Sequence, residues 1–310
     1  MTLPPLLVIA GPTATGKTSL AIEVALALRE AGTPADIISA DSRQVFRGLD
    51  IGTAKPTTTE RRGIPHHGLD LVDPDQPFSV ADFADHVASV LPPIAASGGL
   101  AILAGGTGFY LWAIAGGLDT TVLPSDPAAR GRIEAELADR GLEAAATRLQ
   151  RLAPTLAARL DLRNPRRVAR ALEIAEIAGD APLPAPKPYA GRVAWVGLDL
   201  DRPTHLEWIR ARARGQFHAG LVEEARSLRE RFDPELRAFS AIGYHEAWGL
   251  LDGVLTREQA IEADAARNVA FAKRQRTWFK RESAIAWLDA AAAPLDDAKR
   301  IARALLDDPA

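Results

Sequence analysis

A glycine-bounded loop near the start of the chain carries the clearest chemical signal. In GPTATGKT, residues 11–18, two glycines flank four residues, and Lys17 and Thr18 follow directly. This spacing lets successive backbone N–H groups point into one concavity and bind phosphate oxygens, with a helix N-terminus behind them. The Lys17 ammonium would reach the terminal phosphates, and the Thr18 hydroxyl would hold Mg²⁺. The residues assigned to phosphate binding are Gly11, Pro12, Thr13, Ala14, Thr15, Gly16, Lys17 and Thr18.

Two other segments place polar groups where an apolar run ends. Asp41 follows ADIISA, and GGTG (105–108), with the Thr107 hydroxyl, follows LAILA. Ligands of doubly wound sheets bind at the carboxyl ends of the strands, so we expect both segments to meet the phosphate loop at one site. Asp41 could act there as a general base or a metal ligand, or it could cap a turn.

The hydrophobic pattern predicts the elements that position these segments. Apolar runs predict strands at residues 3–10, 35–40, 100–106 and 193–200. Helical spacing of apolar residues follows the phosphate loop from Lys17 to Glu30, and Pro203 opens a long helical stretch through Arg231. Strands alternating with helices predict an α/β fold, a P-loop NTPase-like parallel sheet flanked by helices on both faces.

A segment of different character interrupts this pattern. Residues 126–178 are rich in Ala, Leu, Arg and Glu, show no strand pattern, and are followed by the Pro-rich stretch APLPAPKP. We interpret residues 120–192 as a helical insertion domain that returns through a stiff linker. The core would then consist of residues 1–119 and 193–310, and its part from 201 to 305 is predicted to be helical throughout.

Composition sets the outer limits. The chain has 310 residues, is 47% hydrophobic and contains no cysteine, which excludes disulfides and thiolate metal sites. The apolar N-terminus lacks a basic flank and is predicted to be a buried strand, not a signal peptide. No apolar run is long enough to span a membrane. We expect a cytoplasmic monomer. Because the net charge is −3, any nucleic acid must bind to local basic clusters.

Two such clusters occur, RNPRRVAR (163–170) and RNVAFAKRQRTWFKR (267–281), and neither contains an acid. Basic residues beside Phe271, Trp278 and Phe279 suit phosphate contact with base stacking. The alternative is a solvated helix face whose aromatic residues turn to the core.

The pair His66 and His67 invites a metal interpretation. Adjacent side chains point in different directions, and no set of ligands surrounds them at useful spacing. A packing or capping role is therefore predicted for both.

Taken in order, the motifs of this chain resemble those of bacterial-type tRNA dimethylallyltransferases over nearly its whole length. DIGTAKP and AKRQRTWF are the most specific of them. The resemblance implies transfer of the dimethylallyl group from dimethylallyl diphosphate to N6 of the adenosine that is 3′-adjacent to the anticodon. The substrates would be tRNAs that read codons beginning with U, held by the anticodon stem-loop. Diphosphate would leave with the help of Mg²⁺, so the loop would hold a diphosphate and not a nucleoside triphosphate.

The resemblance also implies residue roles. Asp41 would take the N6 proton, Thr107 would belong to the same catalytic group, and Arg212 would bind the diphosphate. The implied tRNA contacts are Asp41, Ser42, Arg43, Gln44, Thr107, Arg130, Arg166, Arg167, Val168, Ala169, Arg170, Ser240, Ala241, Ile242, Gly243, Tyr244 and His245.

Three other functions remain open on the sequence. A P-loop small-molecule kinase shares the loop, the Mg²⁺ and a nearby Asp, but it does not explain the insertion or the arginines. Prenyl transfer to free adenine nucleotides would not need such basic surfaces. A non-catalytic RNA-binding NTPase would not bind dimethylallyl diphosphate.

Overall fold

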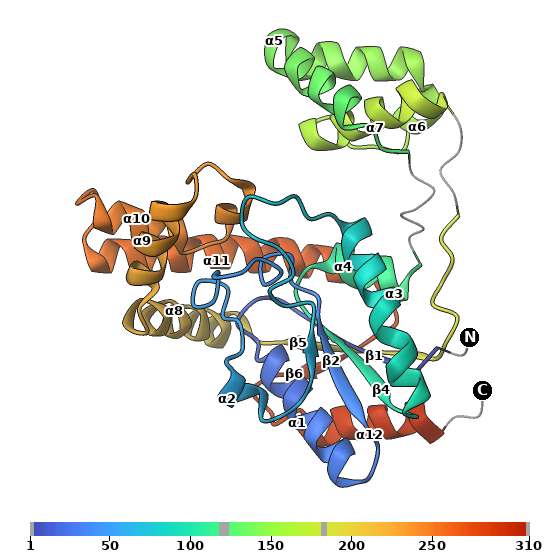
Figure 1. Cartoon of the computed structure of the whole chain (residues 1–310), viewed down its shortest axis with the longest axis vertical. Helices are drawn as coiled ribbons and strands as arrows, with labels where there is room; N and C mark the ends of the chain where they lie inside the picture. Colours follow the sequence, from blue (N-terminus) through green and yellow to red (C-terminus); the bar gives the residue numbers. More distant parts are fainter. Residues whose placement is uncertain (1–2, 118–123, 181–184, 308–310) are drawn as a thin grey trace. The chain divides into compact units, whose positions relative to one another are not determined.

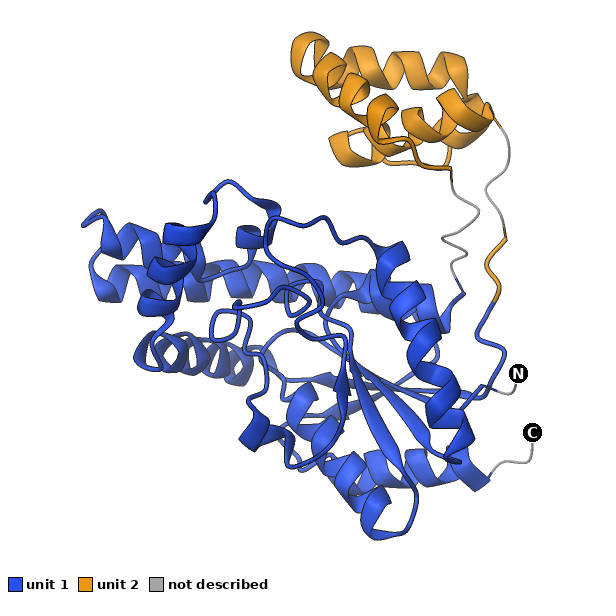
Figure 2. Ribbon diagram, in the orientation of Figure 1, with its two compact units in different colours: residues 1–117, 188–310 blue, residues 118–187 orange. Residues whose placement is uncertain are grey.

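The computed structural model describes residues 3–117, 124–180 and 185–307. The chain divides into two compact units, residues 1–117 with 188–310, and residues 118–187 (Figure 2). The expected boundary at residues 119 and 120, and the start of the Pro-rich linker, lie outside the described residues. The second unit ends at residue 187 and not at 192, because Tyr189 already bonds to the first unit. Its hydroxyl donates to the Pro4 carbonyl at 2.7 Å.

The first unit is built on a six-stranded sheet in the order β3-β2-β4-β1-β5-β6 (Figure 1). All of its strand pairs are parallel. The strands are β1 (Leu6–Ala10), β2 (Ala35–Ser39), β3 (His66–His67), β4 (Leu100–Ala104), β5 (Val193–Asp199) and β6 (Ile285–Asp289). Every residue of β1 and β4 is buried, which explains why these strands are continuous apolar runs without alternation.

Helices cover both faces of this sheet. Leu7 and Ile9 of β1 pack with α1 (Lys17–Glu30) and α12 (Leu295–Asp307), whereas Leu6 and Val8 face the other helices. Those are α3 (Val80–Ala96), α4 (Gly108–Ala115), α8 (Arg202–His218), α9 (Leu221–Arg231), α10 (Tyr244–Leu251) and α11 (Arg257–Phe279). Two short helices, α2 (Thr58–Arg61) and the 3₁₀ helix η1 (Arg237–Ser240), lie between longer elements. The P-loop NTPase-like α/β class is confirmed.

Two sequence predictions were wrong in the C-terminal part. It is not helical throughout, because β6 adds an edge strand whose Ile285 pairs with Trp195 of β5. The run IAWLD is too short to show a period, and its strand state depends on the neighbouring edge. The helical stretch from Pro203 is not continuous either. It ends at His218, and Gly220, at a left-handed φ of 108°, begins α9.

The second unit is helical, as the sequence predicted. It consists of α5 (Pro127–Leu152), α6 (Pro154–Ala157) and α7 (Pro165–Ala178). Its core is formed by Ile133 and Leu149 of α5 with Val168 and Leu172 of α7. The unit therefore has a hydrophobic core of its own.

Candidate active site

The glycine loop has the geometry that phosphate binding requires. Gly11 has φ 145°, and a Cβ there would lie 2.4 Å from the Leu198 carbonyl oxygen, so only glycine fits. Gly16, at φ 82°, precedes the first turn of α1. Within the described part of the chain no side chain caps α1, so its first N–H groups remain available to an anion.

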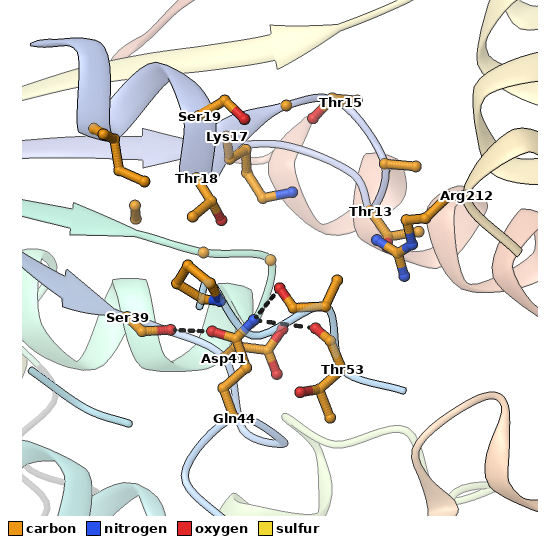
Figure 3. Close-up of a pocket in the computed structure, with 18 of the residues that line it drawn as sticks. Thr13, Thr15, Lys17, Thr18, Ser19, Ser39, Asp41, Gln44, Thr53 and Arg212 are labelled. Atoms are coloured by element: carbon orange, nitrogen blue, oxygen red, sulfur yellow. Dashed lines mark hydrogen bonds between the residues drawn. The ribbon is translucent and has the colours of Figure 1, made fainter. Parts of the chain in front are cut away.

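A cavity of about 510 Å³ opens in front of this loop (Figure 3). Its walls come from the three strand ends that the sequence singled out: the loop itself, Asp41 after β2, and Gly105–Gly106 after β4. Arg212 of α8 and Phe271 of α11 complete it. The predicted convergence of these segments is confirmed.

Two cations meet in the cavity. The polar ends of Lys17 and Arg212 point into the same space as the Asp41 carboxylate (Figure 3). Burial, and then repulsion by Arg212, lower the pKa of Lys17 to about 7, although Asp41 opposes the shift. Burial also lowers the pKa of Arg212, against the attraction of Asp264 and Asp41. The partly desolvated Lys17 and Arg212, which face Asp41, form a site for a polyanion.

Asp41 caps a turn and also lines the cavity. One carboxylate oxygen, Oδ1, accepts from the Arg43 N–H at 2.8 Å, which is a turn-capping bond. The same carboxylate also lines the cavity. The turn thus fixes the orientation of Asp41 without removing it from the site.

Thr107 lies beside the cavity and joins two of its walls. Its hydroxyl oxygen accepts from the Ser42 N–H at 3.0 Å, and its own N–H donates to the Ala40 carbonyl at 3.2 Å. Thr107 therefore connects the β4 turn to the segment that carries Asp41.

Two buried side chains that the sequence analysis did not single out hold the phosphate loop. The Gln275 amide oxygen accepts from the Thr13 N–H at 2.8 Å, and its amide nitrogen donates to the Gly106 carbonyl at 2.8 Å. His205 Nε2 lies 2.8 Å from the Thr13 carbonyl oxygen, so it must carry the proton. Burial lowers the pKa of His205, which favours this neutral form. The four-residue spacing from Phe271 to Gln275 was the signal for a face turned to the cavity.

The segment that closes the cavity opposite the phosphate loop is held by its own hydrogen bonds. Gln44 is buried; it accepts from the Ser39 hydroxyl at 2.8 Å and donates to the carbonyls of Thr53 and Ala54. Lys55 has a nearly buried side chain and pairs with Asp50 at 2.6 Å and with Asp70. The implied tRNA contact at Gln44 therefore falls on an amide whose bonding capacity the protein already uses.

Helices α8, α9 and α10 hold the same segment from behind. Glu224 accepts from the Ile51 and Gly52 N–H groups at 2.8 and 3.1 Å, and Gln216 donates to both of their carbonyls. The Tyr244 hydroxyl donates to Glu224 at 2.7 Å. Burial of this cluster raises the pKa values of Glu224 and Tyr244.

The implied tRNA stretch 240–245 is thus of mixed character. Ser240 and His245 are exposed, whereas Ala241 and Tyr244 are buried in the core. The Tyr244 side chain does not reach the surface, so the expectation that it contacts tRNA is corrected to a scaffolding role. Within the AIGYHE motif, Tyr244 supports the fold by packing against the Ile51–Gly52 segment.

The basic stretch of the second unit is also divided. Arg166 and Arg167 are exposed, but Val168 and Ala169 are buried and cannot present side chains to RNA. Arg170 pairs with the fully buried carboxylate of Glu173 at 2.6 Å.

Arg130 bonds to the same carboxylate at 3.0 Å. Two of the arginines assigned to tRNA thus share a buried Glu173, whose pKa the arginines keep low against the opposing effect of burial. The acid that partners Arg170 lies three residues beyond the stretch that looked purely basic.

The second basic cluster, 267–281, matches neither a continuous RNA-binding surface nor a solvated helix face whose aromatic residues all turn to the core. Arg267 pairs with Glu246 and Arg276 with Asp199, each at 2.6 Å. Phe279 is buried in the core, whereas Phe271 lines the cavity.

The two histidines make local contacts. His66 Nδ1 lies 2.8 Å from the Ile64 carbonyl oxygen, and His67 Nε2 lies 3.0 Å from Asp36. These contacts fit the predicted packing role.

No helix in the described ranges is both long and apolar enough to cross a membrane.

Comparison with known proteins gives a consistent result. Residues 44–282 match the IPP transferase family, and residues 4–70 match the isopentenyl transferase family. A tRNA dimethylallyltransferase of Anaeromyxobacter sp. (strain K) is 42% identical, covering 97% of each chain. One of Symbiobacterium thermophilum is 40% identical, covering 92% of this chain and 89% of its own. The tRNA isopentenylpyrophosphate transferase of Bacillus halodurans has a solved structure that covers 98% of this chain and 97% of its own, with 34% identity and a TM-score of 0.71.

The lowered pKa of Lys17 predicts how anion binding depends on pH. The charged ammonium binds the anion, and its charge is lost as the pH rises through about 7. The affinity for inorganic diphosphate should therefore fall by up to about tenfold per pH unit above that value. Calorimetric titration between pH 6 and 9 measures it. In the control variant Lys17→Arg the side chain stays charged over this pH range. Any pH dependence that remains in this variant therefore comes from ionisation of the diphosphate. Parallel profiles for wild type and Lys17→Arg would contradict the prediction.

Proposed function

This chain belongs to the tRNA dimethylallyltransferase family, and on that premise we propose its reaction. The dimethylallyl group of dimethylallyl diphosphate moves to N6 of the adenosine 3′-adjacent to the anticodon. The tRNAs are those that read codons beginning with U, and diphosphate is released. We also propose that the protein works as a cytoplasmic monomer.

The observation that carries this proposal is the opposition of charges across one cavity. The phosphate loop, Lys17 and Arg212 face the Asp41 carboxylate (Figure 3). In the reaction, the bond between the allylic carbon and the diphosphate oxygen breaks, and the electron pair leaves with the diphosphate. Lys17 and Arg212 would stabilise the negative charge that grows there, which is worth most where water is excluded.

Asp41 would act on the other reactant. The N6 nitrogen attacks the allylic carbon, and the proton that it loses passes to a carboxylate oxygen of Asp41. The Arg43 N–H orients this carboxylate by binding Oδ1, and within the described part of the chain no hydrogen bond is made to Oδ2. A positioned base of this kind contributes about 10²- to 10⁴-fold in rate. Ile22 and Phe271 supply apolar surface for the five-carbon group.

The residues present suit Mg²⁺. The Thr18 hydroxyl lines the cavity beside Lys17, and Mg²⁺ commonly takes one or two protein oxygens with substrate phosphates and water as its other ligands. Thr18 would hold the ion. When bound, Mg²⁺ would supply charge neutralisation on the diphosphate.

The target adenosine must leave its stack to reach this cavity. Extruding a base costs a few kcal/mol, and the cost is lowest where the base is unpaired, as in an anticodon loop. Exposed Arg166 and Arg167 of the second unit would contact tRNA phosphates. Such a surface favours tRNA over free adenine nucleotides, which are too small to need an additional phosphate-binding surface.

Donor specificity tests the proposal directly. With tRNA and Mg²⁺ present, labelled dimethylallyl diphosphate should transfer its label to tRNA, and mass spectrometry should place it on N6 of that adenosine. γ-Labelled ATP should transfer nothing. Phosphate transfer from ATP without prenyl transfer would refute the proposal and favour a kinase.

Replacing the base should separate chemistry from binding. Asp41→Asn keeps the side-chain shape and an oxygen for the Arg43 N–H, but it removes the proton acceptor. Turnover should fall by about 10²- to 10⁴-fold while tRNA affinity changes little. Single-turnover kinetics and filter binding measure the two quantities. Near wild-type turnover would leave Asp41 as a turn cap only.

The arginines of the second unit should fall into two classes. Because Arg166 and Arg167 are exposed, replacing both with Ala should reduce the slope of log affinity against log salt by about two. Arg170→Ala should instead reduce the free energy of unfolding by about 1–3 kcal/mol, because it removes one of the two arginines that pair with buried Glu173. Salt titration and urea unfolding measure these effects, with exposed Arg300 of α12 replaced by Ala as the control. Equal behaviour of the two variants would contradict this division.

A further inference from the structure

The outer face of α4 carries a stacked pair of aromatic rings, of which Phe109 is exposed and Trp112 is half-buried. Phe109 is 46% exposed, and Trp112 stacks on it with centroids 6.4 Å apart and planes at 23°. On the opposite face of the same helix, Tyr110 and Leu111 pack in the core. A helix this apolar on all sides is normally covered, so the exposed face indicates a partner.

Trp278 of α11 extends this face. A Cβ on Gly108 would lie 2.3 Å from the Trp278 ring, so the indole rests directly on the first residue of α4. Helix α4 lies beside this part of α11 (Figure 1). We call Phe109, Trp112 and Trp278 the aromatic surface.

The aromatic surface is continuous with the cavity. Phe271 and Gln275 line the cavity, and Trp278 follows at the next position on the same side of α11. The β4 turn, which includes cavity-lining Gly105 and Gly106, leads directly into α4. If one nucleotide of an RNA strand enters the cavity, the nucleotides on either side of it would therefore lie over these rings.

Cations without acidic partners surround Trp278. Within residues 185–307, Arg267 and Arg276 of α11 have acidic partners, but no ion pair is formed by Arg274 or Arg281, both exposed. Positions 274 and 278 lie one turn apart on the same side of α11, and Arg281 follows in the turn just after the helix ends at Phe279. One exposed ring and two half-buried rings beside cations without acidic partners match the pattern that binds single-stranded nucleic acid.

We propose that the aromatic surface stacks the unpaired nucleotides that flank the target adenosine, with Arg274 and Arg281 on their phosphates. This inference rests on the proposed function. Flipping one base into the cavity deprives its neighbours of a stacking partner, and exposed aromatic rings replace that contact for any base.

The test uses the full chain and two anticodon stem-loop RNAs. One RNA is intact, and the other carries abasic nucleotides on both sides of the target adenosine. The variants are Phe109→Ala and Phe109→Ala/Trp112→Ala, and the single variant covers the case in which the double one does not fold. Trp287→Ala is the matched control, because Trp287 is a 42% exposed ring on β6 outside the aromatic surface.

The double variant should bind the intact RNA about tenfold or more weakly, with an unchanged salt slope. On the abasic RNA the loss should disappear, and the control should match wild type on both RNAs. Arg274→Ala should lower the salt slope by about one.

An equal loss on both RNAs would overturn the inference, because the rings would then pack against protein. Unchanged affinity of both variants for the intact RNA would also overturn it. If wild type transfers no prenyl group to intact RNA, the proposed function itself fails, which the labelled-donor assay distinguishes.

Discussion

The buried cations Lys17 and Arg212 share one cavity in this protein, and the loops around that cavity are held by buried hydrogen bonds. Removing the charges of Lys17 and Arg212 from water is unfavourable, and no carboxylate pairs directly with either within the described ranges. Arg212 instead reaches Asn268, 3.5 Å away, which donates to buried Asp264 at 2.7 Å. Burial, followed by repulsion from Glu246, raises the pKa of Asp264 to about 6. The positive charges in the site are therefore not fully neutralised by the protein, and a bound diphosphate would neutralise them.

The loops that line the cavity must be held in place, because their displacement would let water solvate the cations and weaken anion binding. Gln275 and His205 hold the Thr13 peptide from both sides. Glu224 and Gln216 hold the Ile51–Gly52 segment in the same manner. In each case a buried side chain bonds to backbone groups of a loop that the regular elements leave unsatisfied. Segments distant in sequence thus form one preorganised pocket.

The sequence pattern predicted those features that depend on residues close together in the chain. The phosphate loop, the four long strands and the helical insertion follow from glycine positions and hydrophobic period, and the family motifs identified Asp41 and Arg212. Residues that act across long separations were invisible: Gln275 meets Thr13 from 262 positions away. Motif matching also does not show which side chains already bond within the protein. Tyr244 bonds to Glu224, twenty residues away, whereas Gln44 and Arg170 bond to Ser39 and Glu173, five and three residues away.

Urea unfolding of wild type and Lys17→Met, with and without inorganic diphosphate, tests the central claim most directly. Without ligand, Lys17→Met should be more stable than wild type by roughly 1–3 kcal/mol, because it removes an uncompensated cation and keeps an apolar stem. Diphosphate should stabilise wild type and have much less effect on the variant. If ligand-free Lys17→Met is less stable than wild type and both gain equally from diphosphate, the cavity is not organised around its cations.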